Sequence, residues 1–366
     1  MKTVHAIQKQ ESSGRPGRFI RQLSACFLAA LCLSSSVGGC ASAEGNGAPV
    51  QEPASVTVFA MDTVMDITVY GGPKGLTADA EGLIHSLEAA FSVTDPDSEI
   101  YAVNEAGGGS VGADTEALLS DALTLSERTG GMLDCTIYPV LRAWGFTTGD
   151  YRIPSAEELD ALLPLVNWRS VELKDGHVSL EQGQMLDLGA VAKGYTGDRL
   201  IELFRSAGVT SALVNLGGNV QTLGTKPDGS LWRVAVADPF GEGYAGVVET
   251  ADRAVVTSGG YERYFEEDGR IYRHILDPES GIPVDNGLVS VTVVGKSGVL
   301  CDGLSTALFV MGEEKAADFW RGTDDFDVIL LTEDGRILVT EGLERIFSPA
   351  GNWRDAPVTV IRHGEN

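Results

Sequence analysis

The chain has 366 residues and is strongly acidic, with 27 Lys and Arg against 52 Asp and Glu and a net charge of −25. Five of the basic residues and one acidic residue lie in the first 39 positions, so the remainder carries a net charge of −29. A surface this acidic repels phosphate backbones and argues against nucleic-acid binding. An anionic ligand would need a metal ion or locally concentrated donors.

The first 39 residues have the pattern of a secretory signal peptide. Basic residues precede an apolar run from Leu23 to Leu33, which is too short for a membrane span of about 20 residues. The following Val37–Cys40 segment, Val-Gly-Gly-Cys, resembles a bacterial lipobox. We therefore expect lipidation of Cys40 and a protein anchored outside the cytoplasmic membrane. The alternative is ordinary signal cleavage next to a chance cysteine.

Residues 40–55 are small, polar and proline-bearing, which is typical of a flexible tether, and we expect one folded domain over residues 56–362. Cys135 and Cys301 are the cysteines left after Cys40. Two cysteines so far apart are no disulfide framework. They could pair, but we expect two buried thiols.

The first half of the domain mixes strands and helices. Alternating apolar and polar residues predict a strand pair over Ser55–Met61 and Thr63–Tyr70. Helical spacing follows over Leu76–Phe91 and Thr115–Arg128. A capping box of Ser155 with Glu158 predicts a short helix through Leu163.

A helix over Ala190–Ser206 begins the second half, and strands then dominate, at Ser211–Asn215, Trp232–Ala237, Ala254–Thr257, Ile271–Leu276 and Leu288–Val294. The domain closes with a helix over Val299–Met311 and a hairpin of Phe326–Leu331 with Arg336–Thr340. Repeats and regular strand–helix alternation are missing from the pattern. This favours an α+β fold of mainly antiparallel sheets with packed helices over a doubly wound sheet.

Small residues mark the expected join between a strand and a helix in Leu186–Gly194. They let a ligand approach the backbone, a helix start offers N–H groups to phosphate, and Lys193 adds a compact positive charge. An ordinary helix start with a surface lysine is the simpler interpretation of this run alone. The segment is not a Walker loop. Glycine-rich turns at Asn215–Asn219 and Thr257–Tyr261 each follow a strand.

Two further segments contain groups suited to catalysis. His274 lies in a predicted strand beside the Asp277-Pro278 turn and can take a proton from a hydroxyl near neutral pH; the alternative is a structural histidine that bonds the turn. Asp302 and Thr306 are four residues apart on one face of a predicted helix. Their hard oxygens suit Mg²⁺, although both could also be ordinary helix positions.

Together these segments resemble the FAD:protein FMN transferase (ApbE-like) family over almost all of the domain. Ten segments occur in the family's order: Met61–Thr63, Asp97–Ile100 with Asn104, Gly131–Thr136, Trp144–Phe146, Asp187–Gly194, Asn215–Asn219, Asp238-Pro239, Thr257–Tyr264, His274–Gly281 and Asp302–Thr306. No one segment is specific, and the resemblance depends on the ordered set.

The resemblance implies an ApbE (T-fold-like) fold and a Mg²⁺-dependent enzyme that takes FAD as substrate. Such enzymes join FMN through a phosphoester to a threonine or serine of an acceptor protein, often a membrane-associated electron-transfer protein, and release AMP. The family's metal site would fall on Asp302, Thr306 and the carbonyl of Ala190. His274 is the expected base, with Asp302 as the second candidate. Flavin contacts would fall on Met61, Met132, Leu133, Asp134, Asp187, Lys193 and Ile275.

The chain departs from the family pattern at three positions. Thr94 stands where many members have a flavin-stacking tyrosine, Asp62 replaces a glycine, and Asn219 replaces a frequent aspartate. Thr94 keeps one alternative open, Mg²⁺-dependent hydrolysis of FAD to AMP and FMN. A second alternative is a non-catalytic lipoprotein that binds flavin or another solute.

Overall fold

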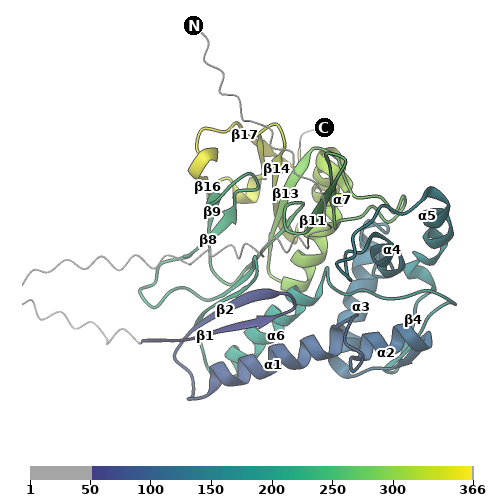
Figure 1. Ribbon diagram of the computed structural model, residues 1–366. Helices are drawn as coiled ribbons and strands as arrows, with labels where there is room; N and C mark the ends of the chain where they lie inside the picture. Colours follow the sequence, from purple (N-terminus) through teal and green to yellow (C-terminus); the bar gives the residue numbers. More distant parts are fainter. Residues whose placement is uncertain (1–51, 365–366) are drawn as a thin grey trace, which may run out of the picture. The chain divides into compact units, whose positions relative to one another are not determined.

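A nine-stranded sheet runs through the part of the chain that the structure, a computed structural model, describes: residues 52–364 (Figure 1). The predicted signal peptide, Cys40 and most of the predicted tether lie outside this range. In spatial order the strands are β1 (Pro53–Ala60), β2 (Thr63–Tyr70), β6 (Ser211–Leu216), β7 (Asn219–Leu223), β10 (Ala254–Gly259), β13 (Leu288–Gly295), β14 (Phe326–Thr332), β15 (Ile337–Thr340) and β17 (Val358–Ile361). All neighbours are antiparallel except β15 and β17.

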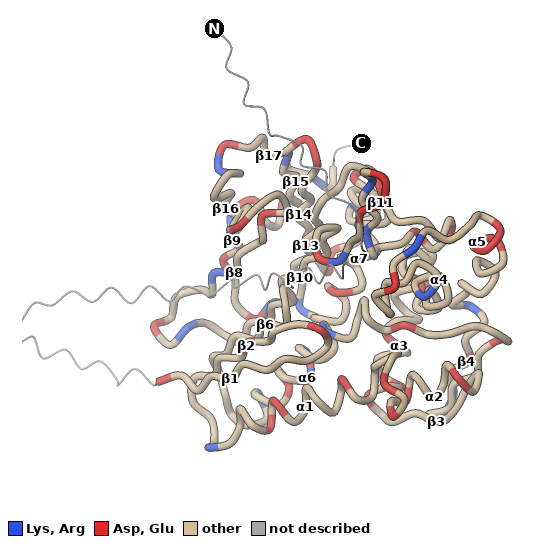
Figure 2. The backbone as a smooth tube through the Cα atoms, viewed as in Figure 1, with Lys and Arg blue, Asp and Glu red and all other residues tan. Residues whose placement is uncertain are grey.

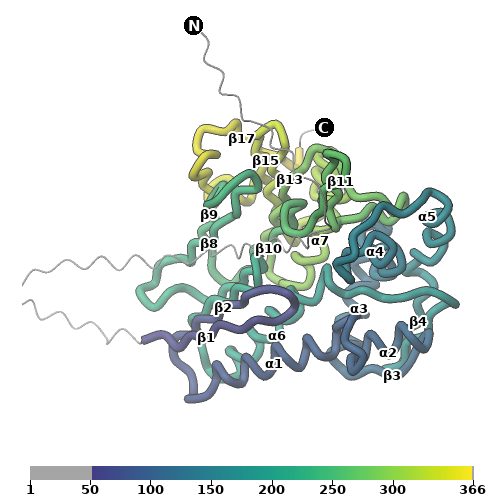
Figure 3. Tube along the Cα trace, in the orientation of Figure 1, coloured from purple at the N-terminus to yellow at the C-terminus, as the bar shows by residue number. Residues whose placement is uncertain are grey.

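Three small antiparallel sheets and seven helices complete the described part of the chain, and Figure 3 lets the reader follow their order by colour. The small sheets are β3 (Gly108–Ser110), β5 (His177–Ser179) and β4 (Glu172–Lys174); β16 (Phe347–Pro349), β9 (Tyr244–Thr250) and β8 (Trp232–Ala237); and β11 (Tyr264–Glu267) with β12 (Arg270–Arg273). The helices are α1 (Leu76–Phe91), α2 (Glu99–Ala106), α3 (Ala113–Arg128), α4 (Tyr138–Trp144), α5 (Ala156–Leu162), α6 (Ala192–Ser206) and α7 (Gly298–Arg321).

Helices cover one face of the large sheet, and the β16-β9-β8 sheet packs on the other face near β13 to β15. Alternation explains the first strands, because β2 buries Met65, Ile67 and Val69 against α1 and α6 and leaves Asp66 exposed. Every residue of β13 is buried, as expected of a strand covered on both faces.

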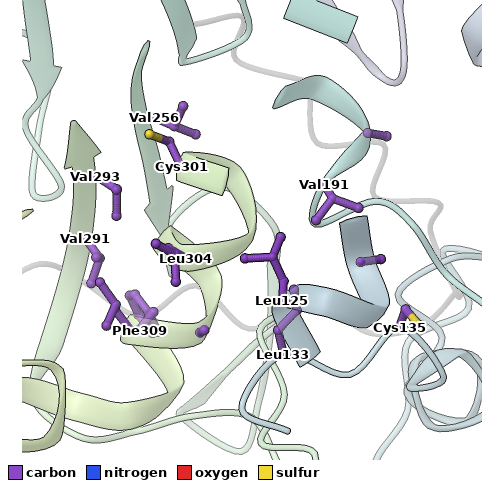
Figure 4. Close-up of a cluster of buried hydrophobic side chains, with 14 of the residues drawn as sticks. Leu125, Leu133, Cys135, Val191, Val256, Val291, Val293, Cys301, Leu304 and Phe309 are labelled. Carbon is purple, nitrogen blue, oxygen red and sulfur yellow. The ribbon is translucent and has the colours of Figure 1, made fainter. Parts of the chain in front are cut away.

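The core beside the candidate site is built around α7. Figure 4 shows Leu304 and Phe309 of α7 near Val291 and Val293 of β13, with Leu125 of α3 on the other side of the helix. All five side chains are buried, and each contributes about 1.5–3 kcal/mol by leaving water. This packing fixes the first half of α7, which carries Asp302 and Thr306.

The predicted α+β class is confirmed, as are the strand pair β1–β2, helix α1 and the hairpin β14–β15. Several boundaries were wrong. The helix expected to end at Met311 continues as α7 to Arg321, with a kink at Gly312. The strand expected over Ile271–Leu276 ends at Arg273, because the next residues turn back on themselves through bonds from Val284 N to Ile275 O and from Gly281 N to Asp277 O. The helix expected from Ala190 begins at Ala192.

Both remaining cysteines, Cys135 and Cys301, are buried and free, as expected. Burial raises the pKa of each thiol well above its usual range, which leaves both unreactive at neutral pH. Among residues 52–364, no helix is both long and apolar enough to cross a membrane.

Candidate active site

One cavity collects ten of the residues that the sequence analysis singled out. Its walls come from the start of α6, the first half of α7, the segment after α3 and the residues that flank the β11–β12 hairpin. The ten residues are Met132, Leu133, Asp134, Asp187, Ala190, Lys193, His274, Ile275, Asp302 and Thr306. Met61 is not part of the lining.

The backbone N–H of Gly194 bonds Asp302 and, as a result, not the carbonyl of Ala190. The Gly194 N–H donates to Asp302 Oδ2 at 2.7 Å. In a regular helix that N–H would bond to the carbonyl four residues earlier, which is that of Ala190. The carbonyl of Ala190 therefore makes no hydrogen bond within residues 52–364 and stays open at the cavity wall. The late start of α6 is thus what releases a backbone oxygen beside Asp302.

Asp302 is a buried carboxylate, with 5% of its surface exposed. Burial raises its pKa, and the charge of Lys193, the Gly194 N–H and the nearby Asn219 side chain oppose that rise. Asn219 is itself buried, and neither atom of its amide is at normal hydrogen-bond distance from a partner in the described chain. A buried amide without a partner is costly, so Asn219 leaves an unsatisfied polar group near Asp302.

The Thr306 hydroxyl lies on the same face of α7 as Asp302 and is held from β10. Ser258 Oγ is 3.2 Å from Thr306 Oγ1 and 2.7 Å from Ser305 Oγ. The sequence analysis gave Ser258 no role, although its glycine-rich strand end was noted. Its contacts identify it as the side chain that orients Thr306.

The crossing of α6 and α7 sets the spacing of these oxygens. A Cβ atom on Gly194 would lie 2.3 Å from the Gly298 carbonyl oxygen, so the two backbones touch at this point. Asp198 of α6 accepts bonds from Gly298 N at 2.7 Å and Val299 N at 3.0 Å and so caps the start of α7. Gln221 of β7 donates to Gly194 O at 2.9 Å. Three elements therefore fix this wall.

His274 lines the same cavity as a neutral imidazole. Burial, followed by the positive charge of Arg263, lowers its pKa to about 4. Its Nδ1 is 3.1 Å from Arg263 O, and because a carbonyl only accepts hydrogen bonds, Nδ1 carries the proton. The unprotonated Nε2 is then available to take a proton, which is the arrangement a general base requires.

Two more carboxylates belong to the lining and are held by the chain itself. Asp134 accepts bonds from Thr136 N at 2.8 Å and Trp168 N at 3.1 Å, and Asp187 accepts one from Gly189 N at 2.7 Å. Burial raises the pKa of both, and these hydrogen bonds oppose the rise. Both side chains thus brace the backbone of the segments that carry them.

Met61 occupies the two-residue turn between β1 and β2. It and Asp62 have φ values of 49° and 59°, as a type I′ hairpin turn requires. Its N–H donates to Glu88 Oε1 at 2.6 Å, and its side chain packs against the buried core. Thr94 is exposed and, like Met61, lies outside the cavity lining.

A hard divalent cation fits the donors on the α6–α7 wall. Residues 52–364 contain no group of three His, Cys, Asp or Glu side chains placed to hold a metal ion. The available set is mixed instead: one buried carboxylate, one hydroxyl and one carbonyl that lacks a hydrogen bond. Mg²⁺ is commonly held by one or two carboxylates together with water and substrate phosphate. These three oxygens therefore suit a shared site of that kind.

Comparison with known proteins assigns the chain to a family. The ApbE family model matches residues 61–330. The chain belongs to the ApbE family. FAD:protein FMN transferases of Klebsiella pneumoniae and Treponema pallidum are 33% and 32% identical to it, over 81% and 86% of this chain and 94% and 92% of their own lengths.

Solved structures of this family have the same fold. The ApbE protein of Thermotoga maritima superposes with a TM-score of 0.76 at 31% identity, covering 81% of this chain and 99% of that structure. The apo flavinyl transferase ApbE of Pseudomonas stutzeri gives 0.73 at 30% identity, covering 81% and 96%. The predicted resemblance and its α+β fold are therefore confirmed.

Proposed function

We propose that the chain is a FAD:protein FMN transferase, which moves FMN from FAD to a threonine or serine hydroxyl of an acceptor protein and releases AMP. Family membership supports the reaction class. The observation that carries the proposal is the cavity, which is lined both by a neutral His274 and by the oxygen donors of Asp302, Thr306 and Ala190.

The cavity suits a dinucleotide with an apolar ring at one end. Met132, Leu133 and Ile275 supply apolar surface for the flavin ring, and Lys193 supplies positive charge for the pyrophosphate. An acidic protein needs such a focused charge to hold an anion. Asp134 and Asp187 keep these segments in place.

The reaction balances with the groups present. The acceptor hydroxyl oxygen forms a bond to the FMN phosphorus, the bond from that phosphorus to the bridging oxygen breaks, and AMP leaves. The hydroxyl proton passes to Nε2 of His274. Asp302 is the weaker candidate for base, because one of its oxygens already accepts the Gly194 N–H.

We further propose that Mg²⁺ is the cofactor. Asp302, Thr306 and the Ala190 carbonyl would hold it, and when bound it would neutralise the charge that develops on the phosphate oxygens. Asn219 lies near Asp302, and its buried amide makes no normal hydrogen bond within the described chain.

The location and the acceptor are proposals that the sequence pattern supports. The Val37–Cys40 segment favours a lipoprotein anchored outside the cytoplasmic membrane by Cys40. An acceptor at the same membrane, such as a membrane-associated electron-transfer protein with a flavinylation motif, would then lie within reach.

The decisive experiment incubates the mature protein with FAD, Mg²⁺ and a candidate acceptor domain. We expect AMP release and an acceptor whose mass increases by one FMN, with flavin fluorescence that survives denaturation. An acceptor with its threonine replaced by valine is the matched control and should stay unlabelled. AMP release equal with and without acceptor, and no labelled protein, would establish the hydrolase instead. Tight FAD binding with no AMP release would establish a binding lipoprotein.

A further inference from the structure

The cavity contains one positive charge to which the sequence analysis gave no role. Apart from the neutral His274, the basic side chains among the described lining residues are Lys193 and Arg263. Neither side chain makes an ion pair or a hydrogen bond within residues 52–364. Elsewhere arginines pair readily: Arg128 bonds Asp325 through two contacts of 2.7 Å.

Several described arginines lack a carboxylate partner, and Arg263 is the one among them whose side chain lines the cavity together with Lys193. Acidic residues lie along every part of the described chain and outnumber basic ones (Figure 2). The side chain of Arg263 is exposed at the cavity, where its planar guanidinium can bind phosphate through two parallel hydrogen bonds.

The charges of Arg263 and Lys193 act on the same groups from two different elements. Burial raises the pKa of Asp187, and both positive charges oppose that rise. Burial lowers the pKa of His274, and the same two charges add to that lowering. Lys193 belongs to α6, and Arg263 lies between β10 and β11. Their fields therefore overlap inside the cavity.

The backbone of Arg263 is bonded to the proposed base. Its carbonyl oxygen accepts from His274 N and from His274 Nδ1, both at 3.1 Å. A shift of Arg263 would thus also shift the imidazole and change the direction of Nε2.

We propose that Arg263 binds the pyrophosphate of FAD together with Lys193, so that the residue that orients the base also holds the phosphate under attack. This inference rests on the proposed function and adds to it a second cationic phosphate ligand and its coupling to His274. The two charges hold the anion in a protein that is otherwise strongly acidic.

The coupling has a consequence for the base. Bound phosphates offset the positive charges that disfavour a proton on His274, so FAD makes its own base stronger. The charged groups that line the cavity around the imidazole are Lys193, Arg263, Glu262, Asp134, Asp187 and Asp302. Of the two positively charged residues, Arg263 is the one whose backbone carbonyl also bonds the His274 imidazole.

The test compares Arg263→Met with Arg233→Met. Arg233 is exposed on β8, 3.6 Å from Glu249 and outside the cavity, so its loss removes one charge without touching the site. Binding of FAD and of riboflavin, which lacks phosphate, is measured by flavin fluorescence in Mg²⁺. For Arg263→Met we expect FAD to bind about 10- to 100-fold more weakly and riboflavin to bind unchanged. Arg233→Met should leave both affinities unchanged, and Arg263→Lys should recover part of the loss.

The pH profile provides a readout that a merely structural role would not change. Loss of a positive charge beside His274 favours its protonation, so the acid limb of kcat/KM for FAD should move to higher pH in Arg263→Met and stay in place in Arg233→Met. Equal FAD affinity in Arg263→Met and wild type would overturn the inference, as would equal losses for FAD and riboflavin. If the wild-type protein binds no FAD, the proposed function fails and this inference falls with it.

Discussion

The two walls of the cavity hold their functional groups in different ways. On the α6–α7 wall, Asp302 is buried and bonded to a backbone amide, and Gly194 packs against Gly298 with no room for a side chain. On the other wall, His274 follows the β11–β12 hairpin, most of whose residues are exposed. The first wall is held by contacts between backbones, and the second by packing of aromatic side chains.

Stacked aromatic rings support the second wall. Phe265 of β11 lies 5.2 Å from Tyr151 and 5.0 Å from Tyr272, with 15° between the ring planes in both pairs. Trp144 extends the stack at 5.5 Å from Tyr272 and donates to Gly281 O at 2.8 Å. Such contacts contribute about 0.5–1.5 kcal/mol per pair. The base is thus supported through aromatic side chains, and the oxygens of the α6–α7 wall through backbone contacts.

This difference suits a reaction with two substrates of unequal size. The phosphate and its metal need fixed oxygens, because a small misplacement is costly to the rate. The base must accept a hydroxyl that arrives on a whole protein, and a hairpin with few buried contacts can adjust to it. Substitutions on the two walls should therefore have different effects on the transfer rate and on stability.

The largest effect is expected for Asp302→Asn on the α6–α7 wall. The amide oxygen can still accept the Gly194 N–H, but the negative charge is lost. Transfer should fall on the order of 10³-fold, because several kcal/mol of metal-dependent stabilisation disappears. AMP release measures the rate, and the thermal midpoint should be unchanged or higher, since a buried charge is removed. A near-wild-type rate would exclude Asp302 from the site.

On the hairpin wall, His274→Gln should reduce transfer by about 10²-fold with normal FAD affinity, as expected for loss of a general base. Unchanged transfer would remove His274 from the mechanism.

The same variant has a stability signature with a definite sign. The pKa of His274 is about 4 in the folded protein and near 6.5 when unfolded. Between these values only the unfolded state binds the proton, so this residue's contribution is fully present above pH 6.5 and is lost as the pH falls to 4. Urea unfolding at pH 4.5 and 7.5 should therefore show His274→Gln gaining stability relative to wild type at the lower pH. A constant difference would contradict the depressed pKa.

The sequence predicted the α6–α7 wall better than the other. The four-residue spacing of Asp302 and Thr306 follows directly from helix geometry, and α7 does place them on one face. The role of the Ala190 carbonyl was predicted only from the resemblance. No sequence pattern reveals that Gly194 N bonds a residue 108 positions later. Ser258 was missed for the same reason: its partners are on another element.

The misses elsewhere have a common physical origin. Strands β9 and β17 are set by pairing with distant segments, β16 and β15, and their own residues carry a weak pattern. The strand expected through His274 ended early because Leu276 and Pro283 form a local bridge. Arg263 belongs to the Thr257–Tyr264 segment of the resemblance, but that run assigns it no role. Its importance comes from the backbone contact that the β10–β11 connection makes with His274.

The smallest change that tests the difference between the two walls is the addition of one methyl group at Gly194. Gly194→Ala would place Cβ 2.3 Å from Gly298 O and 2.7 Å from the Cβ of Asp302, so α6 and α7 must move apart. We expect a loss of about 1–3 kcal/mol in the free energy of unfolding. The apparent affinity for Mg²⁺, measured by its effect on the thermal midpoint, should weaken as well, because a shift of α6 moves both the Gly194 amide that bonds Asp302 and the nearby Ala190 carbonyl.

Gly82→Ala is the matched control, because Gly82 lies in the exposed part of α1 with nothing within 4 Å of a new Cβ. The same methyl group should there raise the free energy of unfolding by about 0.5–1 kcal/mol through helix propensity and leave the response to Mg²⁺ unchanged. If Gly194→Ala were as harmless as Gly82→Ala, the α6–α7 crossing would not be what fixes the oxygens. The two walls would then not differ in how rigidly they hold their functional groups.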